Sequence, residues 1–146
     1  MELYRTSYYS KEIEDSINNL VGKPFGFLQR LKMGGIGSQR FLVEDANIEL
    51  LEVINQHNST PYVNIELRPK GILLMIKLRL DTWSLALPYY QLNIFKNKSD
   101  LGLYCGVWKI KLLPYHNMQL DRKFIAKLMD HRSRYNTGAS AIDPLQ

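Results

Sequence analysis

Three histidines and one cysteine are the side chains of this sequence that most often carry chemistry in proteins. His57, His116 and His131 show no short metal-ligand spacing among them. A nucleophilic Cys-His pair would require Cys105 to lie beside His116, with a general base within hydrogen-bond reach of the thiol. Cys105 falls within a strand pattern, however, and free cysteine is among the residue types most often buried. The pattern therefore predicts neither a metal site nor a nucleophilic cysteine, and a single cysteine excludes an internal disulfide.

Carboxylates and glycines offer no stronger catalytic signal. Acid–base catalysis would need paired Asp or Glu side chains in the strand-rich region, which contains only Glu66, Asp81 and Asp100, two of them in expected turns. The Gly34-Gly35-Ile36-Gly37 stretch could present backbone N–H groups to a phosphate, but it matches neither the dinucleotide fingerprint nor the Walker loop. We interpret it as a hairpin tip. No residue is predicted to be catalytic, to bind a metal or to hold a cofactor.

Basic residues are the strongest functional signal. Residues 1–60 contain 6 Lys/Arg and 8 Asp/Glu, whereas residues 61–146 contain 13 and 6, so the net charge of +5 belongs to the C-terminal part. Strand alternation sends one set of side chains to the same side of the expected sheet, and we call this set the basic face: Arg68, Lys77, Arg79, Lys109 and Lys111. A second set lines one side of the expected C-terminal helix: Lys123, Lys127 and Arg134.

Charge alone would attract a partner but would not bind it tightly. Near an anionic membrane each Lys or Arg contributes roughly 1 kcal/mol, so four contribute about 4 kcal/mol, which corresponds to a millimolar affinity. Specific binding of lipid or nucleic acid would need a preformed pocket or aromatic side chains between the charges. Aromatic residues are available, but alternation predicts that several of them point into the core: Tyr89, Tyr90, Phe95, Tyr104 and Trp108.

Antiparallel strands between residues 25 and 113 must position the basic face, because apolar and polar residues alternate there with period two. The expected strands are 25–32, 40–45, 63–67, 72–80, 83–87, 90–94 and 104–113. The first two form a hairpin around the glycine-rich turn, and Leu80 is expected on the buried side of its strand. Gly102 and Gly106 are expected at a twist or bulge. Residues 47–56 fit a helix and a strand equally, and we expect a short helix or an irregular strand.

Two helices flank the strands. Ser10 is a candidate N-cap for a helix over residues 10–21, which ends at Gly22-Lys23-Pro24. Residues 119–135 change to a 3.6-residue period, with Leu120, Phe124 and Leu128 on one side. The sequence thus predicts an α+β, mostly β, single domain over residues 1–138 and a loose tail over 139–146.

The segment from Ile65 to Leu112 resembles the bacterial pleckstrin-homology-like domains. A strand ends at a Gly71 turn, an aliphatic hairpin spans 72–87, and Leu87-Pro88-Tyr89 leads into a strand that contains Leu92 and Ile94. The resemblance extends over residues 27–135. It implies a curved antiparallel sheet or half-barrel of about six or seven strands, with the C-terminal amphipathic helix plugging its open end.

The same resemblance implies a phosphoinositide site formed by basic residues in and after the first hairpin loop. Lys32 and Arg40 bracket the glycine-rich loop as that pattern requires. Leu42 stands where a second basic residue should follow, and Phe124 stands in place of the helix tryptophan. The chain therefore departs from the phosphoinositide-binding signature at two positions.

We expect a non-enzymatic interaction module of pleckstrin-homology-like type that binds a protein partner or an anionic surface. The candidate binding residues are Lys32, Arg40, Arg68, Lys77, Arg79, Lys109, Lys111, Lys123 and Lys127. A nucleic-acid-binding domain, suggested by the pI near 9.3, and a ligand carrier or enzyme with a pocket in the curved sheet stay as alternatives. No apolar run approaches the ~18 residues of a membrane span, and the acidic N-terminal residues differ from a secretory signal, so a cytoplasmic location is expected.

Overall fold

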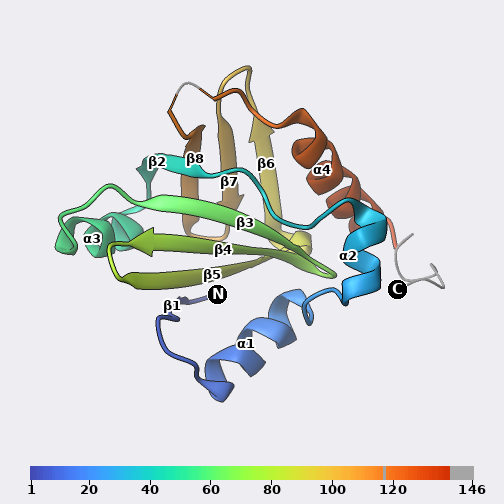
Figure 1. The fold of residues 1–146 in the computed structure, drawn as a ribbon, viewed down its shortest axis with the longest axis horizontal. Helices are drawn as coiled ribbons and strands as arrows, with labels where there is room; N and C mark the ends of the chain where they lie inside the picture. The colour runs from blue at the N-terminus through green and yellow to red at the C-terminus, as the bar shows by residue number, and fades with distance from the viewer. Residues whose placement is uncertain (117, 139–146) are drawn as a thin grey trace.

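The computed structural model describes residues 1–116 and 118–138. Within these residues the chain is α+β and mostly β, with one open antiparallel sheet of eight strands in the order β1-β5-β4-β3-β2-β8-β7-β6 (Figure 1). The strands are β1 (Leu3–Arg5), β2 (Phe41–Ala46), β3 (Tyr62–Arg68), β4 (Gly71–Leu78), β5 (Asp81–Pro88), β6 (Leu92–Lys96), β7 (Leu101–Cys105) and β8 (Trp108–Pro114). The helices are α1 (Lys11–Val21), α2 (Phe27–Met33), α3 (Ile48–Gln56), a 3-10 turn η1 (Tyr89–Gln91) and α4 (Arg122–Asn136).

The sheet bends where the short pairing between β2 and β3 ends. β2 pairs with β3 only through Phe41 opposite Val63 and Leu42 opposite Tyr62. It pairs with β8 from Phe41 to Ala46, with a register shift between Val43 and Asp45. Strands β3, β4 and β5 consequently run across the direction of β6, β7 and β8 (Figure 1). The predicted antiparallel sheet is therefore confirmed, and it is strongly curved.

Helix α4 fills the concave side of this curve, and α1 covers the opposite face of β4 and β5. Phe124, Ile125 and Leu128 of α4 are buried in the main core together with alternate aliphatic side chains of β3, β4 and β5. On the other face, Ile17 and Val21 of α1 form a smaller apolar cluster with neighbours from β4 and β5. Both predicted helices are thus confirmed, because their apolar stripes meet apolar sheet faces.

The predicted hairpin of strands 25–32 and 40–45 is wrong in its first half, because Phe27–Met33 form α2. Leu, Gln, Arg, Lys and Met are strong helix formers. The helix ends in a Schellman motif, in which Gly34 N–H donates to Leu31 O and Gly35 N–H donates to Arg30 O. Gly34 and Gly35 both have positive φ, which glycine adopts without strain. The glycines of the predicted hairpin tip therefore end a helix.

The strand count is larger than expected for two local reasons. Residues 104–113 are not one strand: β7 ends at Cys105, Gly106 turns the chain with φ 59°, and β8 begins at Trp108. β1, which the sequence did not indicate, adds to the edge of β5. Leu80 was expected to be buried but is almost fully exposed, because the β4–β5 hairpin turns at Arg79 and Leu80. The short segment 47–56 is the helix α3.

No helix in the described part of the chain is long and apolar enough to cross a membrane.

Gly71 has the least room for a side chain among the glycines of the described residues. A Cβ atom at this position would lie 2.4 Å from Leu87 O, 2.7 Å from Val21 Cγ1 and 2.8 Å from Pro88 Cα. The β3–β4 turn, the end of β5 and the end of α1 therefore meet where only glycine leaves room. Gly37, by contrast, has open space around the same position.

We predict that Gly71→Ala lowers the free energy of unfolding by about 3 kcal/mol, because backbone atoms must move apart to admit the methyl group. Gly37→Ala should change it by less than about 1 kcal/mol. Urea denaturation followed by circular dichroism measures both. Equal effects of the two substitutions would contradict the packing seen around Gly71.

Candidate cationic groove

The residues of the basic face do not form one surface. Arg68 is only 6% exposed: its Nε donates to Glu66 Oε2 at 2.6 Å, and its Nη1 donates to Asn18 Oδ1 at 3.0 Å and to Gly22 O at 2.9 Å. This arginine therefore fastens the end of α1 to β3 and is unavailable to a partner. The prediction that Arg68 projects to solvent is wrong, because α1 covers that face of the sheet.

Two other predicted lysines are also engaged within the protein. Lys127 Nζ donates to the carbonyls of Met33, Gly34 and Gly35 at 3.3, 3.2 and 3.0 Å, so it caps the C-terminal end of α2. Lys111 forms ion pairs with Glu44 at 3.5 Å and with Asp100 at 3.9 Å. Both ammonium groups therefore have partners within the protein and are less available to a ligand than the sequence pattern indicated.

The remaining predicted residues lie apart from one another. Lys77 is exposed near the end of β4, Lys109 on β8, Lys123 on α4 and Lys32 on α2. Arg79 lies in the β4–β5 turn with φ 57°, not in a strand, and its Nη2 donates to Asn58 O at 3.4 Å.

Arg40 lies over two aromatic rings just before β2. Its guanidinium carbon is 5.1 Å from the Tyr62 ring centroid and 5.3 Å from the Tyr115 ring centroid. Lys32 and Arg40 therefore do not bracket a hairpin loop, since one belongs to α2 and the other precedes β2 across the glycine segment.

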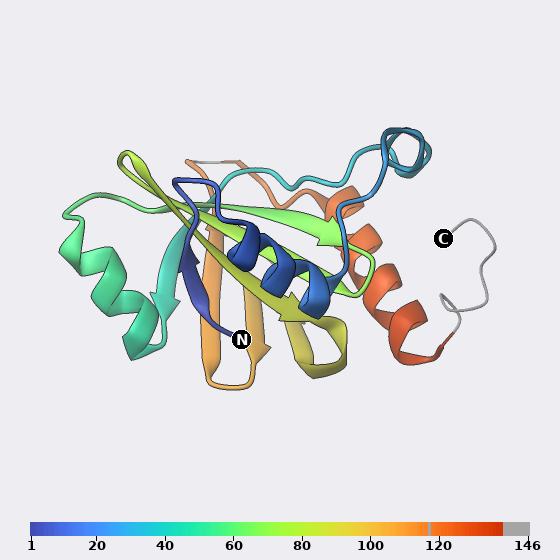
Figure 2. The ribbon, with the colours of Figure 1, turned by 90° about the horizontal axis from the view of Figure 1, so that it is seen from below.

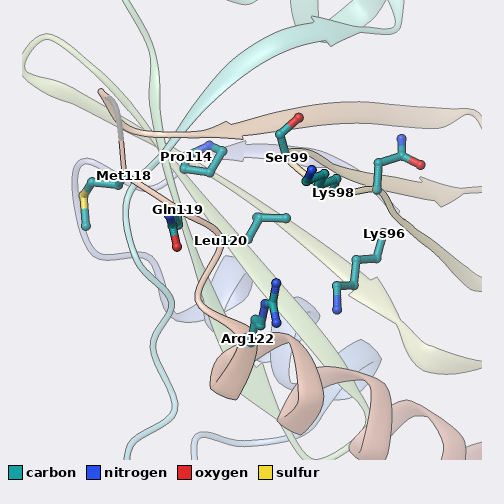
Figure 3. A pocket seen from close by; sticks show the side chains of 9 residues that line it. Lys96, Lys98, Ser99, Pro114, Met118, Gln119, Leu120 and Arg122 are labelled. Carbon is teal, nitrogen blue, oxygen red and sulfur yellow. The ribbon is translucent and has the colours of Figure 1, made fainter.

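The structure instead brings together three cations that the sequence did not single out. Lys96 ends β6, Lys98 lies in the β6–β7 turn, and Arg122 begins α4. They line an open groove of about 750 Å³, whose other described lining residues are Asn97, Ser99, Pro114, Met118, Gln119 and Leu120. None of the described lining residues is acidic. In Figure 3, Lys96 and Arg122 point toward each other from opposite walls of the groove, with Leu120 beside them.

The two walls of the groove are held by short hydrogen bonds. Asn97 closes the β6–β7 turn, donating from its backbone N–H to Asp100 O at 3.0 Å and from Nδ2 to Asp100 Oδ1 at 2.8 Å. Gln39 holds the other wall, because its Nε2 donates to Gln119 O at 2.9 Å and its Oε1 accepts from Asp121 N–H at 2.5 Å. Asp121 then caps α4 by accepting from the N–H groups of Lys123 and Phe124.

Like charges facing each other across a groove repel, and an anion between them removes that repulsion. The lining residues add side-chain amides at Asn97 and Gln119 and a hydroxyl at Ser99, which can donate further hydrogen bonds to oxygen atoms. The arrangement therefore suits a ligand with several negatively charged oxygens. Because Lys96 and Arg122 are 26 positions apart in the sequence, only the meeting of β6 with α4 reveals the site.

Cysteine and histidine stay in separate environments. Burial raises the pKa of Cys105 to about 11, which leaves the thiol protonated at neutral pH. Burial lowers the pKa of His131, whose ring packs edge-on against Phe25 with the ring centroids 6.1 Å apart. His116 lies in the loop after β8, against Tyr115.

His57 belongs to a polar cluster that ties three elements together. Its Nε2 lies 3.1 Å from Asp81 Oδ2, while Ser7 donates to Asp81 Oδ1 at 3.0 Å and Arg5 Nη2 donates to the same oxygen at 2.8 Å. The serine hydroxyl thus points at the carboxylate and not at the imidazole, unlike a nucleophile with its general base. The cluster joins the segment after β1 and the end of α3 to β5. Among the described residues, no three His, Cys, Asp or Glu side chains are placed to share a metal ion.

The expectation that several of these five aromatic side chains point into the core holds for two of them. Tyr89 and Trp108 are buried, whereas Tyr90, Phe95 and Tyr104 are exposed. Phe95 and Tyr104 contact each other edge to face, with ring centroids 5.1 Å apart, and Tyr104 lies against Gly102. An aromatic pair therefore lies on the outer face of β6 and β7.

Comparisons with family models, with curated proteins and with solved structures found no match for this chain. The pleckstrin-homology-like assignment therefore stays a prediction, and the geometry of the groove is what bears on function.

We predict that Arg68→Ala lowers the free energy of unfolding by about 3 kcal/mol, because it breaks a buried ion pair and two hydrogen bonds to α1. Lys77→Ala, which removes an exposed cation from the neighbouring strand, should change it by less than about 0.5 kcal/mol. Chemical denaturation of the two variants side by side makes the comparison. Similar losses would mean that Arg68 does not fasten α1.

Proposed function

We propose that this protein is a non-enzymatic interaction module that binds an anionic, phosphate-rich ligand in the groove between β6 and α4. The observation that carries the proposal is the convergence of Lys96 and Arg122, which point toward each other with no acidic residue among the described lining residues (Figure 3). A volume of about 750 Å³ lies within the usual range for small-ligand sites.

The strength of binding limits the class of ligand. A charge-assisted hydrogen bond contributes about 1.5 kcal/mol, so three contribute about 4.5 kcal/mol, which corresponds to a dissociation constant of about 0.5 mM. A single phosphate would therefore bind weakly. A ligand with several phosphates can engage Lys96, Lys98 and Arg122 together with the neighbouring amides and bind correspondingly more tightly.

The pleckstrin-homology-like type is part of this proposal and is supported by how the resembling residues lie. Gly71 occupies the close contact at the β3–β4 turn, and Pro88 and Tyr89 lead through η1 into β6. Leu92 is buried in β6, and α4 packs into the concave side of the curved sheet. Lys32 and Arg40, however, are not among the described lining residues of the groove, so the proposed site differs from the one that the resemblance implies.

The interior of the curve gives no comparable support to a ligand carrier. Ile65, Leu74 and Phe124 are buried between the sheet and α4 and belong to one continuous apolar cluster. Side chains therefore occupy the place where a carried ligand would lie.

We predict that the protein binds tripolyphosphate in low salt and that Lys96→Glu/Arg122→Glu weakens this binding about tenfold or more, because two attractive charges become repulsive. Isothermal titration calorimetry measures the dissociation constants, with citrate as a second anion that lacks phosphate. Higher salt should weaken binding, since the groove is open to solvent.

The matched control is Lys77→Glu/Lys109→Glu, which changes the net charge equally at exposed positions outside the groove. Its dissociation constant should stay within about threefold of the unmodified protein. An equal loss in both double variants would show that net charge, and not the groove, is responsible. Circular dichroism confirms that each variant is folded.

Single-stranded nucleic acid is a second candidate ligand, favoured by the exposed Phe95–Tyr104 pair with Lys109 opposite Tyr104 on the neighbouring strand. Stacking on such side chains contributes about 1–3 kcal/mol per base. We expect a gel shift with a single-stranded oligonucleotide that disappears as salt rises and is lost in Phe95→Ala/Tyr104→Ala. No shift at low salt would end this alternative.

A further inference from the structure

The short helix α2 exposes an unusually large apolar surface. Phe27, Leu28 and Leu31 are 67%, 73% and 63% exposed, and α2 has no buried residue. Water-exposed apolar side chains occur singly on most proteins, but three on one turn of helix form a patch that marks an interaction site. We infer that α2 docks onto the surface of an anionic lipid bilayer and inserts these three side chains, which we call the α2 tip.

The tip has the pattern of an interfacial helix. At about 100° per residue, Phe27, Leu28 and Leu31 share an arc of about 100°, and Arg30 and Lys32 lie on either side of that arc. Met33 lies on the opposite side and packs against the main core. Long basic side chains at the edges of an apolar arc can reach lipid phosphates while the apolar side chains enter the hydrocarbon boundary.

Charge complementarity identifies the partner as anionic. The segment from residue 22 to residue 40 contains four basic residues and no Asp or Glu. The basic residues are Lys23, Arg30, Lys32 and Arg40. The segment lies within residues 1–60, whose overall charge is negative, so its basic residues stand out from the rest of that part of the sequence.

The tip is held in a fixed orientation. Phe25 and Ile36, which flank α2 in the sequence, are both buried in the core. Lys127 Nζ donates to the carbonyls of Met33, Gly34 and Gly35, and the N–H groups of the Schellman glycines donate to carbonyls of the last turn of α2. Docking therefore requires little ordering of the chain, and a preorganised surface binds more tightly than a flexible one.

The position of α2 suits contact with a flat bilayer. In Figures 1 and 2 the segment that carries α2 lies at the periphery, outside the sheet. Lys23, Arg30 and Lys32 alone would contribute only about 3 kcal/mol, which is weaker than a millimolar affinity, but burying each apolar side chain strengthens partitioning by about tenfold to a hundredfold. The apolar tip therefore supplies the affinity that charge alone lacks.

This inference does not depend on the proposed ligand groove, because no α2 residue lines it. Vesicle co-sedimentation tests it, with vesicles of phosphatidylcholine alone and of phosphatidylcholine with 30% phosphatidylserine. We expect the full chain to bind the anionic vesicles at least tenfold more tightly than the neutral ones. Phe27→Gln/Leu28→Gln/Leu31→Gln should reduce that binding by about a hundredfold or more, while glutamine preserves helix propensity.

The matched control is Ile48→Gln/Leu80→Gln/Val107→Gln, which removes three apolar side chains elsewhere on the surface that are 74%, 99% and 72% exposed. It should bind anionic vesicles within about threefold of the unmodified protein. In addition, Leu28→Trp should show a blue-shifted fluorescence maximum on adding anionic vesicles, which reports insertion directly.

Four outcomes would overturn the inference. The first is that the unmodified protein does not bind anionic vesicles, and the second is that the two triple variants lose binding equally. The third is that vesicle binding is lost in Lys96→Glu/Arg122→Glu but kept in the α2 variant, which would assign membrane binding to the groove and leave the proposed function intact. The fourth is a dimer in analytical ultracentrifugation that the α2 substitutions abolish, because a second copy of the chain would then be the partner of the tip.

Discussion

The short pairing between β2 and β3 is the constraint on which the other features depend. Phe41 and Leu42 pair with both β3 and β8, and the rest of β2 pairs with β8 alone, so β3 diverges from β2 and the two parts of the sheet run in different directions. The sheet therefore curves and leaves a concave side that must be filled by apolar side chains. α4 fills it, and Arg122 at its start lines the groove while Lys127 near its middle holds α2. A single helix thereby positions both surfaces that we assign to binding.

The two faces of the sheet explain why the basic residues have different roles. α1 covers the outer face of β4 and β5, so the side chain of Arg68 lies at a buried junction and satisfies Glu66 and the end of α1. The outer face of β6, β7 and β8 has no such cover, and Tyr104 and Lys109 remain exposed there. The same alternation of side chains therefore places Arg68 where it stabilises the fold and places Tyr104 and Lys109 where they face solvent.

Much of the fold could be predicted from local patterns. The alternation through Val63, Ile65 and Leu67 and the 3.6-residue period through Phe124 and Leu128 each correspond to the observed element, because each face meets the core as its period requires. The sequence pattern did not predict α2, because Gly34 and Gly35 are typical both of a helix end and of a hairpin turn. It also did not predict the boundary between β7 and β8, because a turn of only two residues interrupts the alternation at Gly106.

The sequence by itself determined the class of fold, its two flanking helices and the absence of a recognisable catalytic motif, because these follow from periodicity, capping residues and residue type. Only the tertiary structure decided which charges are available. Hydrogen bonds across long sequence separations engage Arg68 and Lys127, while the contact between the β6–β7 turn and the start of α4 assembles Lys96, Lys98 and Arg122. Only the structure, likewise, leaves Phe27, Leu28 and Leu31 in solvent, because α2 lies beyond the edge of the core. Local patterns contain no information on which distant segments become neighbours, and those neighbours determine whether a side chain stabilises the fold or faces a partner.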